Sequence, residues 1–463
     1  MKITLYGAAG TVTGSAYYLQ TDTASVLVDF GVFQGNKTLE AKNSKIPPIR
    51  LDKLNSVILT HAHLDHTGRL PLLVKSGYQG PVYATPATID LVGLVLLDSV
   101  RVQAHDLKRL NRKRQRTGQP PAEAPYTEED VRKLLGLLVP ISYNEPKEIG
   151  PGCFARVKEA GHILGSVSIE LTAEEKGKKK VILFSGDVGP LDMAIVKDPE
   201  TFVSADLVFL ESTYGDRDHR SMEETIKEGG EIIDQAIRDK GKILVPSFAI
   251  GRTQQLFYYM AKAIEHGSVE LIPVYLDSPM AIEATRIYLK HQELYDEETL
   301  EMFRSGALAG DLSKVHLCVT PEESMALNSV EGPCMIIAGA GMCNAGRILH
   351  HLRHNLWKPE THVMIVGYQG DGSLGRRLID GASKVRIFGE EIAVKAKISS
   401  LNGLSAHAGQ TDLLRWFDKL APGKPKVVLS HGEDRGRIPL AELIRKRYQL
   451  EPVLPEYGMT ITL

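Results

Sequence analysis

The chain has 463 residues, more than one hydrophobic core usually organises, so at least two domains are expected. Hydrophobic residues make up 43% of the chain and charged residues 24%, and 55 basic residues nearly balance 57 acidic ones, which excludes a protein coated in positive charge. The sequence contains no apolar stretch of membrane-spanning length and no C-x-x-C pair among its four cysteines. We therefore expect a cytoplasmic protein without a membrane partner, a disulfide framework or a cysteine zinc site.

The hydrophobic pattern changes near residue 212. Before it, strands are predicted at 2–6, 17–20, 26–29, 57–59, 154–159, 167–171, 181–185 and 207–211, and helices at 68–75, 86–116 and 128–138. After it, strands at 243–246, 274–276, 335–338 and 363–366 precede helices at 252–265, 281–290, 347–357 and 374–379. Such repeating units predict a parallel, doubly wound sheet. The tail returns to short strands at 394–400 and 427–430.

A dense cluster of metal-ligand residues, His61, His63, Asp65 and His66, follows the strand predicted at 57–59. Imidazole and carboxylate groups are the ligands of zinc and similar metals. In extended backbone His61 and His63 point to the same side, whereas Asp65 and His66 fall in the turn into the next helix, near a second ion. A polar turn with solvated histidines is the alternative, but the chain has only 15 histidines and chance clustering of three within six residues is rare.

Four further residues of ligand type follow predicted strands: Asp29, His162, Asp187 and His431. For each one alone a structural role is the simpler explanation; Asp29 or Asp187, for example, could cap a turn. Together with the histidine cluster they predict a site at one edge of a sheet, because strand ends deliver side chains there.

In this order, the residues resemble the ligand pattern of the metallo-β-lactamase superfamily. The resemblance implies an α/β protein, an αββα sandwich with two metal ions per chain, usually Zn²⁺, with other divalent metals also compatible. It implies that His61, His63 and His162 hold one ion, that Asp65, His66 and His431 hold the other, and that Asp187 bridges them. Asp29 would orient ligands through hydrogen bonds.

Later motifs resemble the β-CASP nucleases of this superfamily, in particular stand-alone bacterial and archaeal relatives of the catalytic subunit of the cleavage-and-polyadenylation factor. The motifs contain Glu211 at a strand end, His407 in 405–408 and His431 in 430–432, and related segments lie at 247–252, 339–347 and 366–377. The resemblance implies an inserted doubly wound α/β domain at 209–392 between metallo-β-lactamase segments 1–208 and 393–463. A histidine at the last motif, here His431, is associated with RNA-cleaving members.

The expected activity is metal-dependent hydrolysis of RNA phosphodiester bonds in a cleft between the two domains. Two ions can activate water for in-line displacement, with Asp65 and Asp187 among the catalytic groups. His407 is the expected general acid, because imidazole titrates near neutral pH, and Glu211 would keep it charged and oriented. Backbone clamps for RNA are expected at Arg252, Gly339, Gly341, Arg347, Arg376 and Arg377.

Other interpretations stay open at this point. The chain could hydrolyse another ester or a thioester, or be a non-catalytic RNA-processing scaffold. His350, His351 and His354 have the spacing of a metal-binding helix face, but we favour surface or interface positions. Residues 101–116 carry seven Lys or Arg residues against Asp106 alone, which indicates a solvated helix or a phosphate-contacting arm. Endonuclease or 5′-exonuclease action and the oligomeric state, a homodimer included, are left open.

Overall fold

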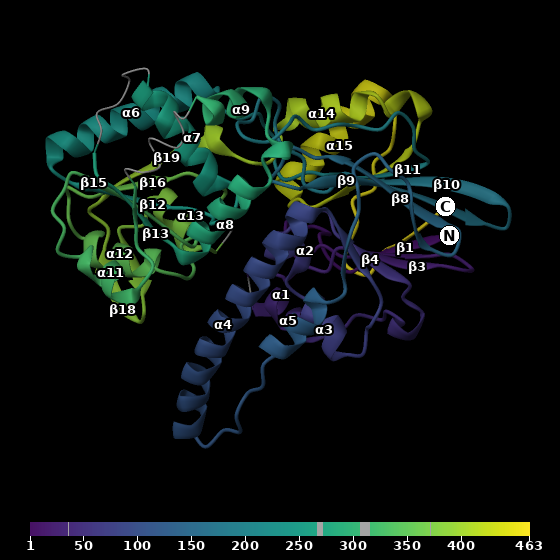
Figure 1. The fold of residues 1–463 in the computed structure, drawn as a ribbon, viewed down its shortest axis with the longest axis horizontal. Helices are drawn as coiled ribbons and strands as arrows, with labels where there is room; N and C mark the ends of the chain where they lie inside the picture. Colours follow the sequence, from purple (N-terminus) through teal and green to yellow (C-terminus); the bar gives the residue numbers. More distant parts are fainter. Residues whose placement is uncertain (36, 266–271, 306–314, 371) are drawn as a thin grey trace. The chain divides into compact units, whose positions relative to one another are not determined.

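The computed structural model describes residues 1–35, 37–265, 272–305, 315–370 and 372–463 (Figure 1). These residues form two compact units. Unit 1 comprises Met1–Leu191, Asp198–Asp218 and His407–Leu463, and unit 2 comprises Asp192–Lys197 and His219–Ala406. Unit 2 therefore interrupts unit 1 in the sequence. It extends beyond the predicted limit at residue 392, because the strand that follows this position pairs within the sheet of unit 2.

Two mixed sheets build unit 1. The first has the order β21-β1-β2-β3-β4-β5-β6, and the second has the order β20-β11-β10-β9-β8-β7. The strands of the first are β1 (Lys2–Leu5), β2 (Tyr17–Gln20), β3 (Ser25–Val28), β4 (Ser56–Ile58), β5 (Val82–Ala84), β6 (Leu138–Pro140) and β21 (Thr460–Thr462). Those of the second are β7 (Lys147–Gly150), β8 (Cys153–Glu159), β9 (Val167–Glu175), β10 (Lys178–Phe184), β11 (Leu207–Glu211) and β20 (Lys426–Ser430).

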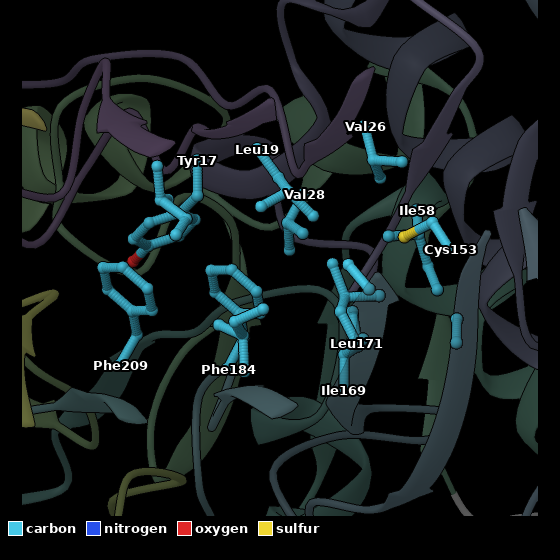
Figure 2. Packing of buried hydrophobic residues seen from close by; sticks show 14 of the residues in the cluster. Tyr17, Leu19, Val26, Val28, Ile58, Cys153, Ile169, Leu171, Phe184 and Phe209 are labelled. Atoms are coloured by element: carbon cyan, nitrogen blue, oxygen red, sulfur yellow. The ribbon is translucent and has the colours of Figure 1, made fainter. Parts of the chain in front are cut away.

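The two sheets of unit 1 bury a shared apolar core. Figure 2 shows Tyr17, Leu19, Val26 and Val28 meeting Ile169, Leu171, Phe184 and Phe209 of the other sheet. The rings of Phe184 and Phe209 are stacked at 4.8 Å, and the ring of Tyr17 lies within 5.4 Å of both. Burial of side chains of this size stabilises a fold by about 1.5–3 kcal/mol each.

Helices accompany both sheets of unit 1. The helices linked to the first sheet are α1 (Lys37–Glu40), α2 (Leu64–Thr67), α3 (Leu70–Lys75), α4 (Pro86–Arg116) and α5 (Glu128–Leu135), with short 3₁₀ turns at Ala41–Ser44 and Leu51–Lys53. A second core joins the outer face of the other sheet to α14 (Gln410–Asp418) and α15 (Asp434–Tyr448), and a 3₁₀ turn lies at Ala421–Gly423. The predicted αββα sandwich is thereby confirmed.

Unit 2 is built on an all-parallel sheet of order β14-β13-β15-β12-β16-β19. Its strands are β12 (Lys242–Pro246), β13 (Val274–Asp277), β14 (Val315–Leu317), β15 (Cys334–Ala338), β16 (His362–Ile365) and β19 (Lys397–Ser400). Strands β12 and β15 are buried along their whole length, as expected of a parallel sheet covered on both faces.

Helices cover both faces of this sheet, which confirms the predicted doubly wound α/β architecture. Met335 and Met364 face α6 and α7, whereas Ile336 and Ile365 pack in a core with α12. The helices are α6 (Met222–Asp239), α7 (Arg252–Glu265), α8 (Pro279–Lys290), α9 (Glu297–Arg304), α11 (Pro321–Ala326), α12 (Ile348–Asn355) and α13 (Leu374–Ile379). A hairpin of β17 (Lys384–Ile387) and β18 (Glu390–Ala393) and 3₁₀ turns at Gln292–Leu294 and Asn402–Leu404 complete the unit. Within the described residues, no helix combines the length and the apolar character needed to cross a membrane.

Candidate metal centre

The predicted ligands lie in unit 1 and converge because they follow parallel strands. Asp29 comes directly after β3, and His61 follows the neighbouring parallel strand β4. In the other sheet β10, β11 and β20 run parallel to one another, and Asp187, Glu211 and His431 lie at or just beyond their carboxyl ends. Strands that run in the same direction end at the same sheet edge, so these side chains meet there.

Three imidazole rings form the first half of the site. The Nε2 atoms of His61 and His162 lie 3.1 and 3.2 Å from Nδ1 of His63. Burial lowers the pKa of both His61 and His63, so these rings are neutral at neutral pH. Neutral imidazole carries a lone pair on one ring nitrogen, and three such nitrogens that face one another form a ready site for a cation.

The carboxylate of Asp187 lies between two sets of ligands. Its Oδ2 is 3.5 Å from Nε2 of His61 and 3.6 Å from Nε2 of His162. Its Oδ1 is 3.4 Å both from Nε2 of His66 and from Nδ1 of His431. Ligand atoms about 2.1 Å from a tetrahedral zinc ion lie about 3.4 Å apart, so the separations between Asp187 and the Nε2 atoms of His61, His162 and His66 suit coordination better than direct hydrogen bonding.

Asp65, His66 and His431 form the second half. Oδ2 of Asp65 lies 3.5 Å from Nε2 of His431 and 4.0 Å from Nε2 of His66. Burial raises the pKa of Asp65, but the imidazoles of His431 and His66 outweigh this and hold it below the usual range. The potential ligand atoms of this trio all lie within 4.8 Å of one another, as do those of His61, His63, His162 and Asp187.

Two observations indicate that the residues of this cluster can bind a metal ion. Buried atoms of the cluster, among them Asp187 Oδ1 and His431 Nε2, have no hydrogen-bond partner among the described residues. Buried polar atoms are normally satisfied, so these two are suited to coordinate a cation. The donor set of imidazole nitrogens and carboxylate oxygens is also the one that zinc prefers. A third group, Asp187, His407 and His431, shares two members with the others.

Two threonines fix the protonated nitrogen of neighbouring ligands, and the sequence did not single them out. Thr60 Oγ1 donates to Asp29 Oδ2 at 2.7 Å and lies 3.1 Å from His61 Nδ1, so it can accept that proton. Thr213 Oγ1 donates to the carbonyl of His431 and lies 3.1 Å from its Nδ1. Both arrangements leave the Nε2 lone pair for the cluster. A hydroxyl beside a ligand motif has no spacing signature that could have revealed it.

Asp29 organises the same region. It accepts the Nδ1–H of His66 at 2.7 Å and the backbone N–H of Thr60 at 2.8 Å. Burial lowers the pKa of His66, but the carboxylates of Asp187 and Asp29 raise it well above the usual value. With its Nδ1 held by Asp29, the His66 ring presents Nε2 to the cluster.

His407 and Glu211 form a separate pair beside the ligands. His407 Nδ1 donates to Glu211 Oε1 at 3.0 Å, and its Nε2 is 3.9 Å from Asp187 Oδ2. Backbone N–H groups of Val188 and Thr213 hold the Glu211 carboxylate at 3.0 and 3.1 Å. Burial lowers the pKa of His407, but Glu211 and Asp187 raise it to about 9. Glu211 and Asp187 therefore favour the protonated form of His407, which lies at the edge of the cluster.

Comparison with known proteins identifies the family of this chain. Residues 9–208 match the metallo-beta-lactamase superfamily, residues 253–378 match the Beta-Casp domain, and residues 391–455 match the Zn-dependent metallo-hydrolase RNA specificity domain. Over 461 residues the chain is 39% identical to Ribonuclease TTHA0252 of Thermus thermophilus, with 99% of each chain covered. The chain belongs to the β-CASP ribonuclease family. This confirms the predicted superfamily and the predicted class of zinc-dependent hydrolase.

Other β-CASP relatives are more distant. The chain is 31% identical over 468 residues to the transcription termination factor FttA of Methanothermobacter thermautotrophicus, covering 98% of this chain and 70% of that protein. It is 29% identical over 462 residues to FttA of Methanosarcina mazei, covering 97% and 70%. A crystal structure of a protein of unknown function from Enterococcus faecalis V583 has a TM-score of 0.53 and 14% identity, and covers 100% of this chain and 99% of that one. This last similarity supports the fold alone.

The residues predicted to clamp RNA lie in unit 2, which contains the β-CASP match, and several already have internal partners. Arg347 pairs with buried Asp277 at 2.7 Å and donates to the carbonyls of Cys318 and Val319. Arg252 is buried and donates to Gln255. Arg376 pairs with Asp380, and Arg377 donates to the carbonyl of Lys384. A Cβ at Gly341 would lie 2.5 Å from the Phe248 ring, whereas Gly339 has more room. RNA contact at these positions stays a prediction.

The three histidines of α12 do not share one environment. His351 is buried and donates to Asp277 at 2.7 Å, so it lies inside unit 2 and not at the predicted surface or interface position. His350 lies beside the ring of Phe388 at 4.7 Å. The exposed His354 is not grouped with other ligand-type residues in the described part of the chain.

Proposed function

We propose that this β-CASP protein hydrolyses RNA phosphodiester bonds at the metal centre of unit 1, with two zinc ions bound. The position of Asp187 carries the proposal: its two carboxylate oxygens face two different sets of histidines. The choice of RNA is supported by the match at 391–455 to an RNA specificity domain, which includes His407 and His431, and by the relative named a ribonuclease.

Each ion has its own ligands in this proposal. His61, His63 and His162 would hold one, Asp65, His66 and His431 would hold the other, and Asp187 would contact both. Bound zinc supplies Lewis-acid chemistry, which stabilises negative charge on phosphoryl oxygens and makes water a better nucleophile at neutral pH. The threonine and aspartate contacts behind the ligands keep the imidazole lone pairs directed at the cluster.

His407 would supply the proton that the leaving oxygen needs. Its Nδ1–H is fixed by Glu211, which leaves the Nε2–H beside Asp187 as the proton that can move. Glu211 stabilises the charged imidazole before the transfer and is itself held by two backbone N–H groups. A side chain that transfers a proton in the transition state typically accelerates a reaction by about 10²–10⁴-fold.

RNA cleavage by the zinc-loaded protein tests the proposal, together with three variants. His407→Asn should lower kcat by about 10²–10⁴-fold with unchanged zinc content, because the residue is a proton donor. Asp187→Asn should lose both zinc and activity. The matched control is His354→Asn, which alters an exposed histidine of unit 2 and should retain full activity.

Two results would contradict the proposal. Turnover of a model thioester without RNA cleavage would favour a hydrolase of small substrates. A zinc content far below two ions per chain in a folded, inactive wild type would favour a non-catalytic scaffold.

A further inference from the structure

The second half of α4 carries a one-sided stripe of positive charge. We name residues 101–116 of this helix the basic arm; it projects from the body of unit 1 in Figure 1. At 100° per residue, six of its cations lie within about 140° of the helix circumference. They are Arg101, Lys108, Arg109, Arg112, Lys113 and Arg116, and all six are exposed. His105, also exposed, lies in the same arc.

The opposite side of the basic arm is anchored. Asn111 exchanges two hydrogen bonds with the backbone of Ala122, at 2.8 and 3.0 Å, and Arg114 donates to the carbonyl of Pro120. Gln103 donates to the hydroxyl of Tyr126 at 2.9 Å. The returning chain thus holds one face of the helix and leaves the cationic face open. The contacts of the returning chain therefore fix which face of the helix presents its positive charges to solvent.

None of the six cations, all of them in the described part of the chain, forms a close ion pair, although Asp98 and Arg101 interact electrostatically. In the described part of the chain, none of them lies within 4.0 Å of a carboxylate, although on the neighbouring helix α5 Arg132 and Lys133 pair with Glu128 and Glu129. Like charges at i and i+4, such as Lys108, Arg112 and Arg116, destabilise a helix by about 0.2–0.5 kcal/mol per pair. An external polyanion would remove this repulsion.

We propose that the basic arm is a second RNA-binding surface, which holds the backbone of single-stranded RNA away from the metal centre. The proposal rests on the RNA substrate proposed above. An anionic membrane is a poorer fit, because membrane-surface helices oppose their cations with a broad apolar face. The large exposed aliphatic residues of the arm are Val102 and Leu110, and its remaining face is occupied by the returning chain.

The start of α4 links the arm to the metal centre. Thr85, the N-cap, and Thr88 both donate to the carbonyl of Gly165, three residues after His162. At 1.5 Å per residue, Arg101 lies about 22 Å and Arg116 about 45 Å along the axis from the first residue of α4. A strand stacked as in B-DNA advances about 3.4 Å per nucleotide, so it would need about 7 and 13 nucleotides to cover these distances, and an extended strand would need fewer. A very short RNA cannot contact both surfaces at once.

Charge removal at matched positions tests the proposal. The arm variant carries Lys108→Gln, Arg112→Gln and Arg116→Gln; the control carries Lys176→Gln, Lys178→Gln and Lys179→Gln on the exposed β9–β10 hairpin of unit 1. Affinity for a long and a very short single-stranded RNA is measured by fluorescence anisotropy across a salt series. All titrated proteins also carry His407→Asn, which should slow RNA cleavage by about 10²–10⁴-fold while zinc stays bound. Cleavage of both RNAs is measured without that change.

The arm variant should bind the long RNA on the order of 10-fold more weakly, and the slope of log affinity against log salt should fall by about 2, at about 0.7 per lost phosphate contact. Binding and cleavage of the short RNA should not change, and the control should match wild type. An unchanged salt slope, or equal losses in both variants, would overturn the proposal. So would loss of binding to phosphatidylserine vesicles with RNA affinity retained. If the wild-type protein cleaves neither RNA, the proposed ribonuclease function is wrong. The anisotropy measurements would still show whether the basic arm binds RNA.

Discussion

At the residue scale, Thr60 determines which nitrogen of His61 is available to a metal. Its hydroxyl proton goes to Asp29, so the oxygen can accept the Nδ1–H of His61. The Nε2 lone pair then points toward His63 and Asp187. Asp29 itself has a φ of +56°, a left-handed conformation that aspartate tolerates better than most residues. One turn residue and one hydroxyl therefore orient two ligands, His61 and His66.

Replacement of Thr60 by valine, which has the same shape, should weaken zinc binding by about 10–100-fold, because His61 loses its acceptor and Asp29 loses a donor. Thr60→Ser keeps the hydroxyl and should remain within a few-fold of wild type. Competition with a chromogenic chelator measures both affinities, and circular dichroism checks the fold. Equal zinc affinity in the valine and serine variants would show that the hydroxyl does not orient His61.

At the element scale, α2 can hold its ligands only because residue 31 lacks a side chain. A Cβ at Gly31 would lie 1.6 Å from the carbonyl oxygen of Asp65 and 2.4 Å from the backbone nitrogen of His66. The backbone also joins the two segments directly, since Phe30 N–H donates to the carbonyl of His66 at 2.8 Å. The loop after β3 and the ligand-bearing turn of α2 are therefore in contact through their main chains.

Gly31→Ala should displace α2, with a loss of about 1–3 kcal/mol or more in unfolding free energy and loss of zinc from the half of the site that contains Asp65 and His66. Gly423→Ala is the matched control, because a Cβ there meets nothing within 4 Å. Urea unfolding and zinc content per chain measure the two effects. Full zinc content in Gly31→Ala would mean that the loop can move aside.

Strong periodicity made most elements of this fold predictable from sequence. The long helix α4 was predicted at its observed limits, and β2 and β11 also match, because apolar runs there are bounded by clear turn or cap residues. Strands β5 and β6 were missed because three residues are too few to show alternation; β4 has the same length but was predicted from its apolar run. Helix α6 was missed as well; Gly229 and Gly230 lie in its middle and lower its helix propensity.

The residues of the candidate site were also predictable only where a local sequence pattern marks them. Its ligand-type residues could be identified because each comes after an apolar strand, and the αββα order brings those strand ends together. The partner of Arg347 and His351 could not be predicted, because nothing near them in sequence reveals Asp277 at the end of β13. Long-range pairing of this kind depends on the strand order of unit 2, which local patterns do not contain.

The Asp277 cluster should stabilise unit 2. This fully buried carboxylate accepts hydrogen bonds from Arg347, His351 and Ser324, at 2.6–2.7 Å. Asp277→Asn should lower the unfolding free energy by about 2–4 kcal/mol at neutral pH, because Arg347 and His351 lose their anionic partner. Urea unfolding followed by Trp357 fluorescence measures this loss in a Trp416→Phe background, since these are the two tryptophans of the chain and Trp416 lies in unit 1.

The loss of unfolding free energy in Asp277→Asn should also depend on pH. Burial raises the pKa of Asp277, but the hydrogen bonds from His351, Ser324 and Arg347 outweigh it and hold the pKa below its ordinary value of 3.8. A carboxylate whose pKa is lower in the folded than in the unfolded protein stabilises the folded state at pH values above the unfolded pKa. This stabilisation is lost as the pH falls through the pKa of the folded state. The difference between wild type and Asp277→Asn should therefore be largest at neutral pH and shrink below pH 3.8. A difference independent of pH would exclude the ionic contribution.

At the scale of the whole molecule, the metal centre joins two distant stretches of one unit. Asp29 to Glu211 precede most of unit 2 in the sequence, whereas His407 and His431 follow it, yet all of them lie in unit 1. A bound metal would therefore tie the tail of unit 1 to its first segments. Unit 2 has its own sheet and its own core, and contributes none of the proposed zinc ligands.

Zinc removal should consequently affect the units unequally. A ligand present at 1,000 times its Kd stabilises the state that binds it by about 4.1 kcal/mol, and chelation removes that contribution from unit 1. Hydrogen–deuterium exchange with mass spectrometry should show faster exchange in β10, β11 and β20 after chelation, with little change in β12 and β15 of unit 2. Re-addition of zinc should restore protection, and Asp187→Asn should exchange like the chelated protein with or without added zinc. Equal loss of protection in both sheets would show that the two units unfold together, and unchanged exchange in β20 would show that His431 does not tie the tail to a metal.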